Sequence, residues 1–283
     1  ADPGEALVAL KSETSVEEAG FDNVIRLTQF TNDPRVNDQW GLDETPGVNL
    51  AKAWDVSTGE ASIVVAVIDT GIQLDHPDLV SNIWTNPGEV AGNGIDDDGN
   101  GYIDDVHGWD FYNDDSDPSD DHGHGTHVAG TIGADADNGI GVSGVAHDVQ
   151  LMALKAFNSQ GLTYNNSTLR ALEYAMDNGA EISNHSYGGA YSSTAEESLI
   201  EEAADQGHVL VVAAGNAGSN NDIAGMFPAS YPSGNIISVA ALDQTGSMAS
   251  FSNYGSTSVD IAAPGRDILS TLPGGTYGYM SGT

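Results

Sequence analysis

The chain of 283 residues carries 42 Asp and Glu against 7 Lys and Arg, which gives a formal net charge of −35. Such an acidic surface repels phosphate backbones and anionic lipid headgroups, so nucleic-acid and membrane partners are not expected, whereas bound or screening cations are. The lack of Cys excludes disulfides, thiolate catalysis and zinc–thiolate sites, and 39% hydrophobic residues with 35 Gly indicate a compact globular chain.

Residues 1–31 do not share the pattern of the later sequence. We expect a short strand over 4–11 and a short helix over 14–22. The segment is interpreted as the remnant of a leader or prosegment, or as an arm packed on the domain. The domain itself is expected to cover 32–283.

From residue 62 onward, short apolar runs alternate with helical or glycine-rich segments. Because the runs lack the polar alternation of a half-exposed strand, they are typical of parallel strands that are buried on both faces. The predicted strands cover residues 62–69, 149–157, 180–189, 208–216, 235–242 and 259–265.

Amphipathic segments between the apolar runs predict helices over 167–179 and 193–207. The first helix places Leu169, Leu172 and Met176 on one stripe, and each segment ends at a glycine suited to the C′ position. Alternating strands and helices predict an α/β fold, a doubly wound and mostly parallel sheet with helices on both faces. Functional sites in such sheets lie outside the carboxyl ends of the strands.

Polar side chains occur where several of these segments begin or end. Asp69 and Asn216 each end an apolar run, and a glycine-rich segment between them contains His122, His124 and His127. Taken alone, each residue is typical of a turn or a cap. The three histidines also permit a zinc site, but the His-Glu-x-x-His helix of a catalytic zinc site does not occur.

The order of these polar segments is more specific than any one of them. Asp-Thr-Gly at 69–71, His-Gly-Thr-His-Val-Ala-Gly at 124–130, Asn-His-Ser-Tyr-Gly-Gly at 184–189 and Ala-Ala-Gly-Asn at 213–216 closely resemble the motifs of the subtilisin-like serine proteases. The resemblance begins near Asn32 and continues through the later segments FPASYP, SFSNYG, IAAPG and YMSGT.

The resemblance implies a secreted serine endopeptidase, in which a histidine oriented by a buried carboxylate activates a serine. It matches Asp69 to the acid, His124 to the general base and Asn216 to the oxyanion-hole donor. The family's nucleophile follows Gly-Thr in Gly-Thr-Ser-Met-Ala, so we expect it directly after Thr283, and we expect these residues to lack the helix that carries it. The alternatives are a non-catalytic subtilase-like binding protein (a pseudo-protease) and a calcium-dependent adhesion domain.

The resemblance also implies that a peptide or protein substrate binds as an added β-strand between two segments of the enzyme. The matching residues are Gly161, Leu162 and Thr163 on one side and Ser186, Tyr187 and Gly188 on the other. The pocket for the side chain before the scissile bond would be walled by Ala213, Ala214 and Gly215. These small walls predict a roomy pocket and a preference for large hydrophobic residues. A monomer with an inhibitory prosegment is expected.

Three acidic stretches predict calcium sites, with two or three Ca²⁺ ions in all, and the alternative for each is a solvated acidic loop. The first stretch, 96–105, spaces its oxygen donors as an EF-hand loop does, with Gly101 at position 6. Position 12 is His107 instead of Glu, so another carboxylate must supply the bidentate ligand. The predicted ligands are Asp96, Asp98, Asn100, the Tyr102 carbonyl and Asp105.

The other two calcium sites are implied by the resemblance. One would use Asp110, Asn113, Asp115 and Asp117. The other would use Asp33, Asp78 and Asn138 with the carbonyls of Ile140 and Val142. Because clustered carboxylates repel one another without a cation between them, ion binding is expected to stabilise the native state.

Overall fold

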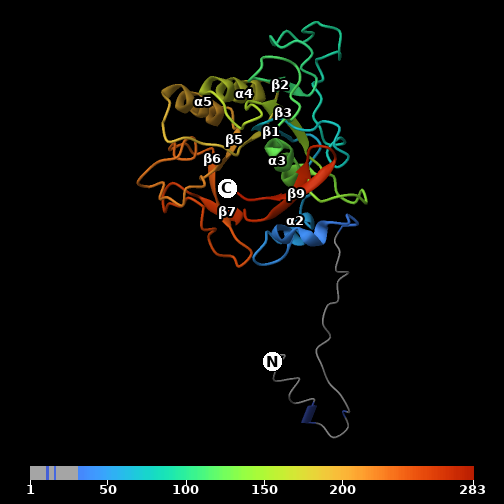
Figure 1. Cartoon of the computed structure of the whole chain (residues 1–283), viewed down its shortest axis with the longest axis vertical. Coiled ribbons are helices and arrows are strands. Elements are labelled where there is room, and N and C mark those ends of the chain that lie inside the picture. The colour runs from blue at the N-terminus through green and yellow to red at the C-terminus, as the bar shows by residue number, and fades with distance from the viewer. Residues whose placement is uncertain (1–10, 13–15, 17–30) are drawn as a thin grey trace. The chain divides into compact units, whose positions relative to one another are not determined.

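The structure of the chain is a computed structural model (Figure 1). The residues that it describes are 11–12, 16 and 31–283. The strand expected over 4–11 lies outside the described residues except for Lys11. The helix expected over 14–22 lies outside them except for Val16. The compact unit described below begins at Thr31.

The centre of the fold is a seven-stranded sheet in which every neighbouring pair of strands is parallel. The strands in chain order are β1 (Val64–Asp69), β2 (Gly108–Asp110), β3 (Gln150–Lys155), β4 (Ile182–His185), β5 (Val209–Ala213), β6 (Ile236–Leu242) and β7 (Ile261–Pro264). Their order in the sheet is β2-β3-β1-β4-β5-β6-β7, so β2 and β3 lie on one side of β1, and β4 to β7 follow in chain order on the other. Such a change of direction places a crevice at the carboxyl end of β1.

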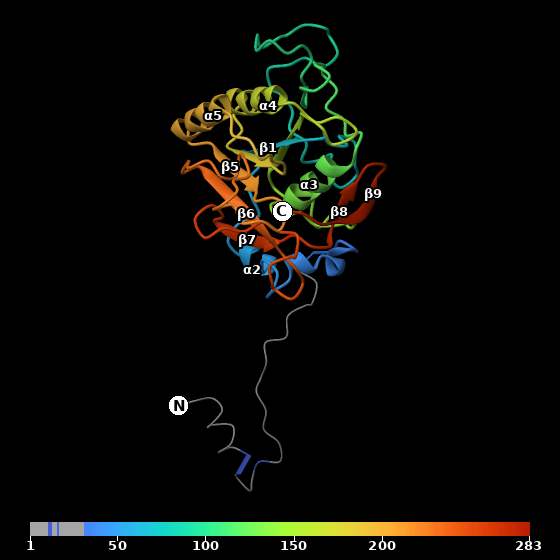
Figure 2. The same ribbon diagram turned by 60° about the vertical axis from the view of Figure 1, so that its left-hand side comes forward.

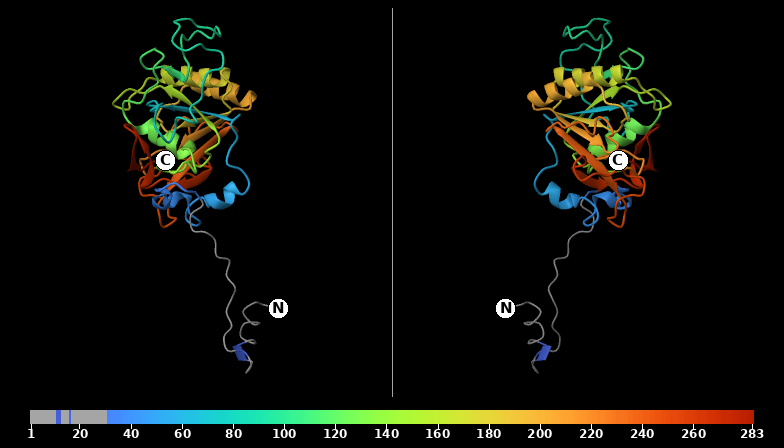
Figure 3. Two further views of the ribbon diagram at one scale, coloured as in Figure 1. Left: turned by 90° about the vertical axis from the view of Figure 1, so that its right-hand side faces the viewer. Right: turned by 90° about the vertical axis from the view of Figure 1, so that its left-hand side faces the viewer.

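Helices cover both faces of the sheet, as predicted (Figures 2 and 3). α4 (Asn165–Asp177) and α5 (Thr194–Asp205) lie on one face, and α3 (His124–Gly133) lies on the other. β1 contributes to both layers, because successive side chains of a strand point to opposite faces. Ile68 packs in the cluster that contains α4 and α5 residues, whereas Val67 packs in the cluster that contains α3 residues.

A two-stranded antiparallel sheet packs against α3. Its strands are β8 (Ile268–Leu272) and β9 (Thr276–Met280). The Ser270 hydroxyl donates a hydrogen bond of 2.7 Å to the His127 carbonyl oxygen. A smaller helix, α2 (Leu50–Trp54), and two 3₁₀ turns precede β1, and the turns cover Val36–Asp38 and Trp40–Leu42.

The two predicted helices end as expected. Gly179 follows α4 and Gly207 follows α5, each with a φ of 78°, a left-handed conformation that favours glycine. On α4, Leu172 is buried, whereas Leu169 and Met176 are only half-buried. The buried face of α4 is wider than the predicted stripe and also includes Ser167, Thr168, Ala171, Tyr174 and Ala175.

The six predicted strands are confirmed, but the sequence overestimates their lengths. The run 180–189 yields only β4, and the run 208–216 yields only β5, where Gly215 with a φ of 110° departs from the extended backbone. β2, β8 and β9 were not predicted. β2 has three residues and lies within the polar stretch 86–121, where no apolar run marks it. None of the helices that the structure describes is long and apolar enough to cross a membrane.

Candidate active site

The end of β1 and the start of α3 meet through a carboxylate and an imidazole. His124 Nδ1 donates to Asp69 Oδ1 at 2.7 Å and lies 2.9 Å from Asp69 Oδ2. A carboxylate can only accept, so the hydrogen resides on Nδ1 and Nε2 remains an acceptor. The Asp69 side chain is 3% exposed and the His124 side chain 38% exposed, so the pair joins a buried acid to a base that solvent or substrate can reach.

The pKa of His124 reflects two opposing effects. Burial of the ring favours the neutral imidazole and lowers the pKa. The hydrogen bond and negative charge of Asp69, together with the charge of Asp120, favour the imidazolium and leave the pKa above its ordinary value. The pair is therefore arranged to accept a proton on the ring.

Two glycines permit the close approach of β1 and α3. Gly71 has a φ of 105°, and a Cβ at this position would lie 2.4 Å from the carbonyl oxygen of Pro118. A Cβ on Gly125 would lie 2.1 Å from the carbonyl oxygen of Gly71. A side chain at Gly125 would push the first turn of α3 away from Asp69, and one at Gly71 would displace the segment 118–120 that precedes α3.

Asp120 and Thr70 hold the first turn of α3 at the end of β1. The Asp120 carboxylate accepts from the Thr126 backbone N–H at 2.9 Å and from the Thr70 hydroxyl at 2.8 Å. The Thr70 hydroxyl in turn accepts from the Gly125 backbone N–H at 2.9 Å. These contacts satisfy N–H groups that the start of a helix leaves free. Asp120 was not predicted from the sequence, although an Asp just ahead of a helix is a capping signal.

Lys155 is a second residue of this region that was not predicted from the sequence. Its side chain is 2% exposed, and Nζ donates to the carbonyl oxygens of Thr70 (2.8 Å) and Phe157 (3.0 Å) and to Asp121 Oδ1 (2.7 Å). Lys155 ends β3 and is paired with Asp69 in the sheet. It therefore joins the segments that follow β1 and β3 to the segment that precedes α3.

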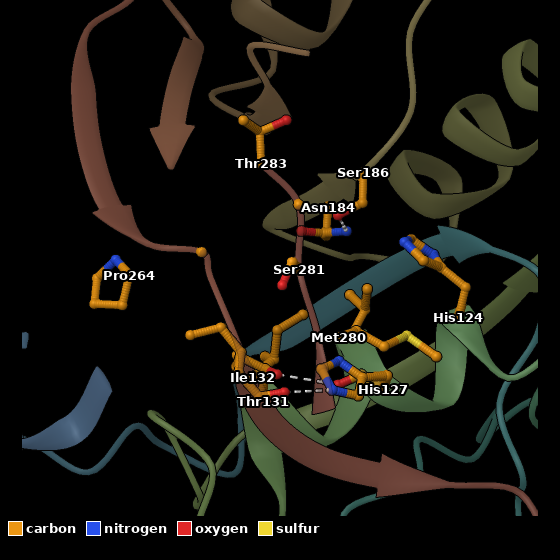
Figure 4. A pocket seen from close by; sticks show the side chains of 14 residues that line it. His124, His127, Thr131, Ile132, Asn184, Ser186, Pro264, Met280, Ser281 and Thr283 are labelled. Carbon is orange, nitrogen blue, oxygen red and sulfur yellow. Dashed lines mark hydrogen bonds between the residues drawn. The ribbon is translucent and has the colours of Figure 1, made fainter. Parts of the chain in front are cut away.

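Asn216 is joined to the same region through Thr283. The Asn216 side-chain oxygen accepts from the backbone N–H and the hydroxyl of Thr283, at 3.1 and 3.2 Å. The backbone N–H of Gly215 donates to the Thr283 hydroxyl at 3.0 Å. Thr283 and His124 line one cavity of about 390 Å³, in which Asn184 and Ser186 lie between them in the view of Figure 4.

A second cavity of about 390 Å³ adjoins the other side of His124. Of the predicted substrate-binding residues, Gly161, Ser186, Tyr187 and Gly188 line it. Asp69 and the ring of Phe157 also line it. The structure therefore brings the two predicted substrate segments together beside the Asp69–His124 pair.

Leu162 and Thr163 do not line this cavity. The Leu162 side chain is 64% exposed, and its backbone N–H and carbonyl oxygen are both hydrogen-bonded to Asn158, at 3.0 Å each. The Thr163 hydroxyl donates to the carbonyl oxygen of Ala156. Both residues shape the turn that presents Gly161.

Ala213, Ala214 and Gly215 line neither cavity. The Ala214 side chain is fully buried, and its carbonyl oxygen accepts from the Asn221 side chain at 2.8 Å. The sequence predicted a roomy pocket beside these residues. In the structure the Met226 side chain lies against Gly215 and narrows this space.

The comparisons with known proteins agree with this geometry. The sequence profile of the Subtilase family of peptidases matches residues 60–283. The chain belongs to the subtilase family. This assignment confirms the predicted family resemblance, and the fold accords with it.

Relatives of this subtilase include named proteases. Thermitase of Thermoactinomyces vulgaris is 36% identical over 253 residues, which cover 89% of this chain and 79% of thermitase. The thermophilic serine proteinase of Bacillus sp. strain AK1 is 40% identical over 231 residues, which cover 82% of this chain and 51% of the relative. This chain thus spans about half the length of the AK1 relative.

Solved structures show the same fold. A structure of proteases from Pseudoalteromonas arctica PAMC 21717 superposes with a TM-score of 0.72 and 32% identity, covering 90% of this chain and 82% of that one. A cold-adapted subtilisin-like serine proteinase superposes with a TM-score of 0.63 and 30% identity, covering 80% and 71%.

The acidic loop of this subtilase over residues 96–105 gathers three carboxylates. One oxygen each of Glu89, Asp96 and Asp98 lies within 4.8 Å of the others, a spacing that could hold a metal ion. Glu89 was not predicted, because it lies outside the EF-hand-like spacing. Asp105 is fully buried and accepts from Asn100 and from the Tyr174 hydroxyl, so it belongs to the hydrogen-bonded network beneath the loop.

Two further predicted ligands of this loop have other contacts. The Asn100 side-chain nitrogen donates to Asp98 at 3.1 Å and to Asp105 at 2.9 Å. The Tyr102 ring packs edge-on against Trp109, with ring centroids 5.0 Å apart. Hydrogen bonds and aromatic packing therefore hold the loop on the domain.

The second acidic stretch forms a turn closed by Asp110. This carboxylate is 1% exposed and accepts from the backbone N–H of Asn113 and from its side-chain nitrogen, both at 2.8 Å. Burial raises the pKa of Asp110 above its ordinary value, against these hydrogen bonds. Asp115 and Asp117 are exposed on the same turn, where Asp115 accepts from the Asp117 backbone N–H at 3.0 Å.

The third predicted calcium site brings together two fully buried carboxylates, Asp33 and Asp78. The Asn138 side-chain nitrogen and the Val142 backbone N–H donate to Asp78 at 2.8 and 2.9 Å. Burial raises the pKa of Asp78 to about 6, against hydrogen bonds that lower it, and the charge of Asp33 adds to the rise. The Ile140 backbone N–H donates to the Asn138 side-chain oxygen at 2.8 Å. Buried carboxylate and amide oxygens are the donor set that calcium prefers.

Proposed function

We propose that this subtilase is a secreted, calcium-stabilised serine endopeptidase that hydrolyses peptide bonds by a Ser-His-Asp mechanism. The observation that carries the proposal is the hydrogen bond from His124 to the buried Asp69, beside a cavity lined by Ser186 and Gly188. Secretion is supported by a relative named as an extracellular protease, from Xanthomonas campestris, which is 36% identical over 290 residues.

In this proposal, His124 Nε2 is the general base. The nucleophile is the serine that the family motif places directly after Thr283. Nε2 takes the serine proton as the serine oxygen attacks the substrate carbonyl carbon, and Asp69 stabilises the imidazolium that forms. The proton then passes to the nitrogen of the leaving amine, the peptide bond breaks, and water hydrolyses the acyl-enzyme with His124 again as the base.

Asn216 supplies the oxyanion donor in the same scheme. Its side-chain oxygen accepts hydrogen bonds from Thr283. The amide nitrogen is therefore the atom that donates to the negative oxygen of the tetrahedral intermediate. Because Thr283 is held by both Asn216 and Gly215, the residue after it would begin next to this donor.

The substrate is proposed to bind as an extended strand between Gly161 and the segment Ser186–Gly188. Main-chain hydrogen bonds of this kind tolerate many sequences, so broad proteolysis of peptides and proteins follows. The enzyme is further proposed to be a monomer that is restrained by an inhibitory prosegment. Two or three Ca²⁺ ions are proposed at the three acidic sites, with Asp33 and Asp78 best suited by their burial.

The proposal is tested by substitutions in the full-length enzyme. We expect Asp69→Asn to lower kcat on a fluorogenic peptide about 10⁴-fold, because the imidazole loses the acceptor that fixes its tautomer. His124→Ala should abolish measurable turnover, and Asn216→Ala should lower kcat about 10²–10³-fold. Circular dichroism spectra should match that of the wild type.

Full turnover in His124→Ala would overturn the mechanism. Labelling with a serine-directed organophosphonate distinguishes the alternative. A pseudo-protease would bind peptide without being labelled and without cleaving it, whereas the proposed enzyme is labelled once and loses activity in step with the label.

A further inference from the structure

The space between two predicted substrate segments is filled by one side chain. A Cβ built on Gly188 would lie 3.0 Å from Sδ of Met226, and a Cβ built on Gly215 would lie 2.9 Å from Cε of Met226. Real Cβ atoms rarely come as close as 3.0 Å to another atom and essentially never closer, so the thioether of Met226 packs directly on the backbone of both glycines. The end of the Met226 side chain thus lies between the segment that contains Gly188 and the segment that contains Gly215.

The backbone around Met226 fixes its position. Phe227, the next residue, exchanges two backbone hydrogen bonds of 2.8 Å with Gly189. The backbone N–H of Met226 donates to the Ser230 hydroxyl at 3.1 Å, and its carbonyl oxygen accepts from the Ser230 backbone N–H at 2.8 Å. Met226 is therefore tied to the Gly188 segment and projects from it toward Gly215.

The opposite wall is fixed as well. The Asn253 side-chain nitrogen donates to the Ala214 carbonyl oxygen at 3.0 Å, and its side-chain oxygen accepts from the backbone N–H groups of Ala217 and Ser219. A Cβ on Gly215 would also lie 2.5 Å from this Asn253 nitrogen. The Gly215 segment cannot move back to enlarge the space, so its free width depends on Met226.

This space adjoins the reacting groups of the proposed mechanism. Gly215 precedes Asn216, and its backbone N–H donates to Thr283. Gly188 lies two residues beyond Ser186, which lines both cavities beside His124. A substrate strand held at Ser186–Gly188 would direct the side chain before its scissile bond between Gly188 and Gly215.

We infer that Met226 makes this subtilase selective for small residues, such as Ala, Gly or Ser, directly before the scissile bond. The inference rests on the proposed endopeptidase function and replaces the preference for large hydrophobic residues that the small walls alone predict. A large residue must displace the thioether from its contacts with both glycines. Because Met is unbranched and flexible, the displacement carries a penalty and does not exclude the residue completely.

The test compares peptides that differ only in the residue before the scissile bond, Ala or Phe. The full-length wild-type enzyme should have a higher kcat/KM for the Ala peptide. Met226→Ala should raise the Phe/Ala ratio of kcat/KM about 10- to 100-fold, the range that one to two methylenes in a pocket supply. Met226→Leu, which keeps the volume, should keep the wild-type ratio.

Met248→Ala is the matched control, because Met248 is 45% exposed and lies outside both cavities. It should leave the ratio unchanged. An equal ratio in Met226→Ala and wild type, or a wild-type preference for Phe, would overturn the inference while leaving the peptidase proposal intact.

Binding gives a second measurement that does not depend on cleavage. Peptides are used whose last residue, Ala or Phe, takes the position directly before the scissile bond. They are titrated into the wild type and Met226→Ala. The variant should gain affinity for the Phe peptide alone. Absence of cleavage in every variant would refute the proposed function, and the affinities would still decide whether Met226 limits the pocket.

Discussion

His124 shows how a single residue acquires its role from its neighbours. Its Nδ1 is occupied by Asp69, which a buried strand holds in place, so Nε2 alone is left to exchange a proton. The same carboxylate raises the pKa of the ring. A general base must be neutral to act, so in the proposed mechanism the carboxylate that orients the ring would also set the lower pH limit of activity.

The pH dependence of catalysis follows from this pair. kcat/KM should fall as the pH falls through the pKa of His124, which lies above the ordinary 6.5. In Asp69→Asn, the fall of the residual kcat/KM on the acid side should move to lower pH, because the charge that favours the imidazolium is gone. The measurement is kcat/KM of the full-length enzyme between about pH 5 and 9.

Asp148→Asn provides the control for this experiment. It removes the carboxylate beside another histidine, His147, at 3.5 Å, without touching the proposed site. Its acid limb should coincide with that of the wild type. A limb in Asp69→Asn that stays in place or moves to higher pH would contradict the role given to Asp69.

The residues of the site differed in how well the sequence could predict them. Asp69, His124 and Asn216 were identified because each sits in a short motif with a fixed order along the chain. Asp120 and Met226 act through contacts with residues far away in sequence. No local pattern distinguishes Met226 from an ordinary core methionine, and only the fold reveals what it lies against.

At the scale of elements, the site depends on the junction of β1, β3 and α3. Lys155 appeared in the sequence as one polar interruption of an apolar run, yet its ammonium group joins the ends of these elements. Continuous apolar runs made the central strands predictable. The short strands β2, β8 and β9 were not, because their pairing partners and not their own composition determine them.

Replacement of Lys155 should loosen this junction. In Lys155→Met, the carbonyl oxygens of Thr70 and Phe157 lose a charged donor, and we expect a loss of about 2–4 kcal/mol in the free energy of unfolding. kcat should fall as well, because Thr70 follows Asp69. Urea denaturation and peptide turnover measure the two effects.

Lys52→Met is the matched substitution, since Lys52 is an exposed residue of α2. It should leave stability and turnover close to those of the wild type. Equal stability of the two variants would show that the buried ammonium group contributes nothing to the junction.

At the scale of the whole molecule, a net charge of −35 favours the binding of cations to the native state. Asp33 and Asp78 are fully buried and sit within mutual electrostatic influence. Burial of ionised carboxylates is costly unless a positive charge lies close to them. The acidic composition predicted this requirement, but which carboxylates are buried emerged only from the fold.

Removal of calcium should therefore lower the melting temperature of this subtilase. A ligand at 100 times its Kd stabilises the native state by about 2.7 kcal/mol per site, which corresponds to about 5–10 °C for a domain of this size. Differential scanning calorimetry with calcium and with excess chelator measures the difference. Asp78→Asn should reduce it, whereas Asp177→Asn, at the exposed end of α4, should not. An identical melting temperature with and without chelator would refute the proposed sites.

The strand order has a consequence for the timing of activity. Asp69 and His124 are separated by 55 residues, and Asn216 meets Thr283 across 67. Every strand pair of the central sheet is parallel and needs a crossover, so we expect these encounters to require slow long-range closure of the chain. A nascent or partly folded copy would therefore have no assembled active site while its own chain is most open to cleavage. For the proposed peptidase, the strand order would thus separate the time at which the chain is most open to cleavage from the time at which its active site can form.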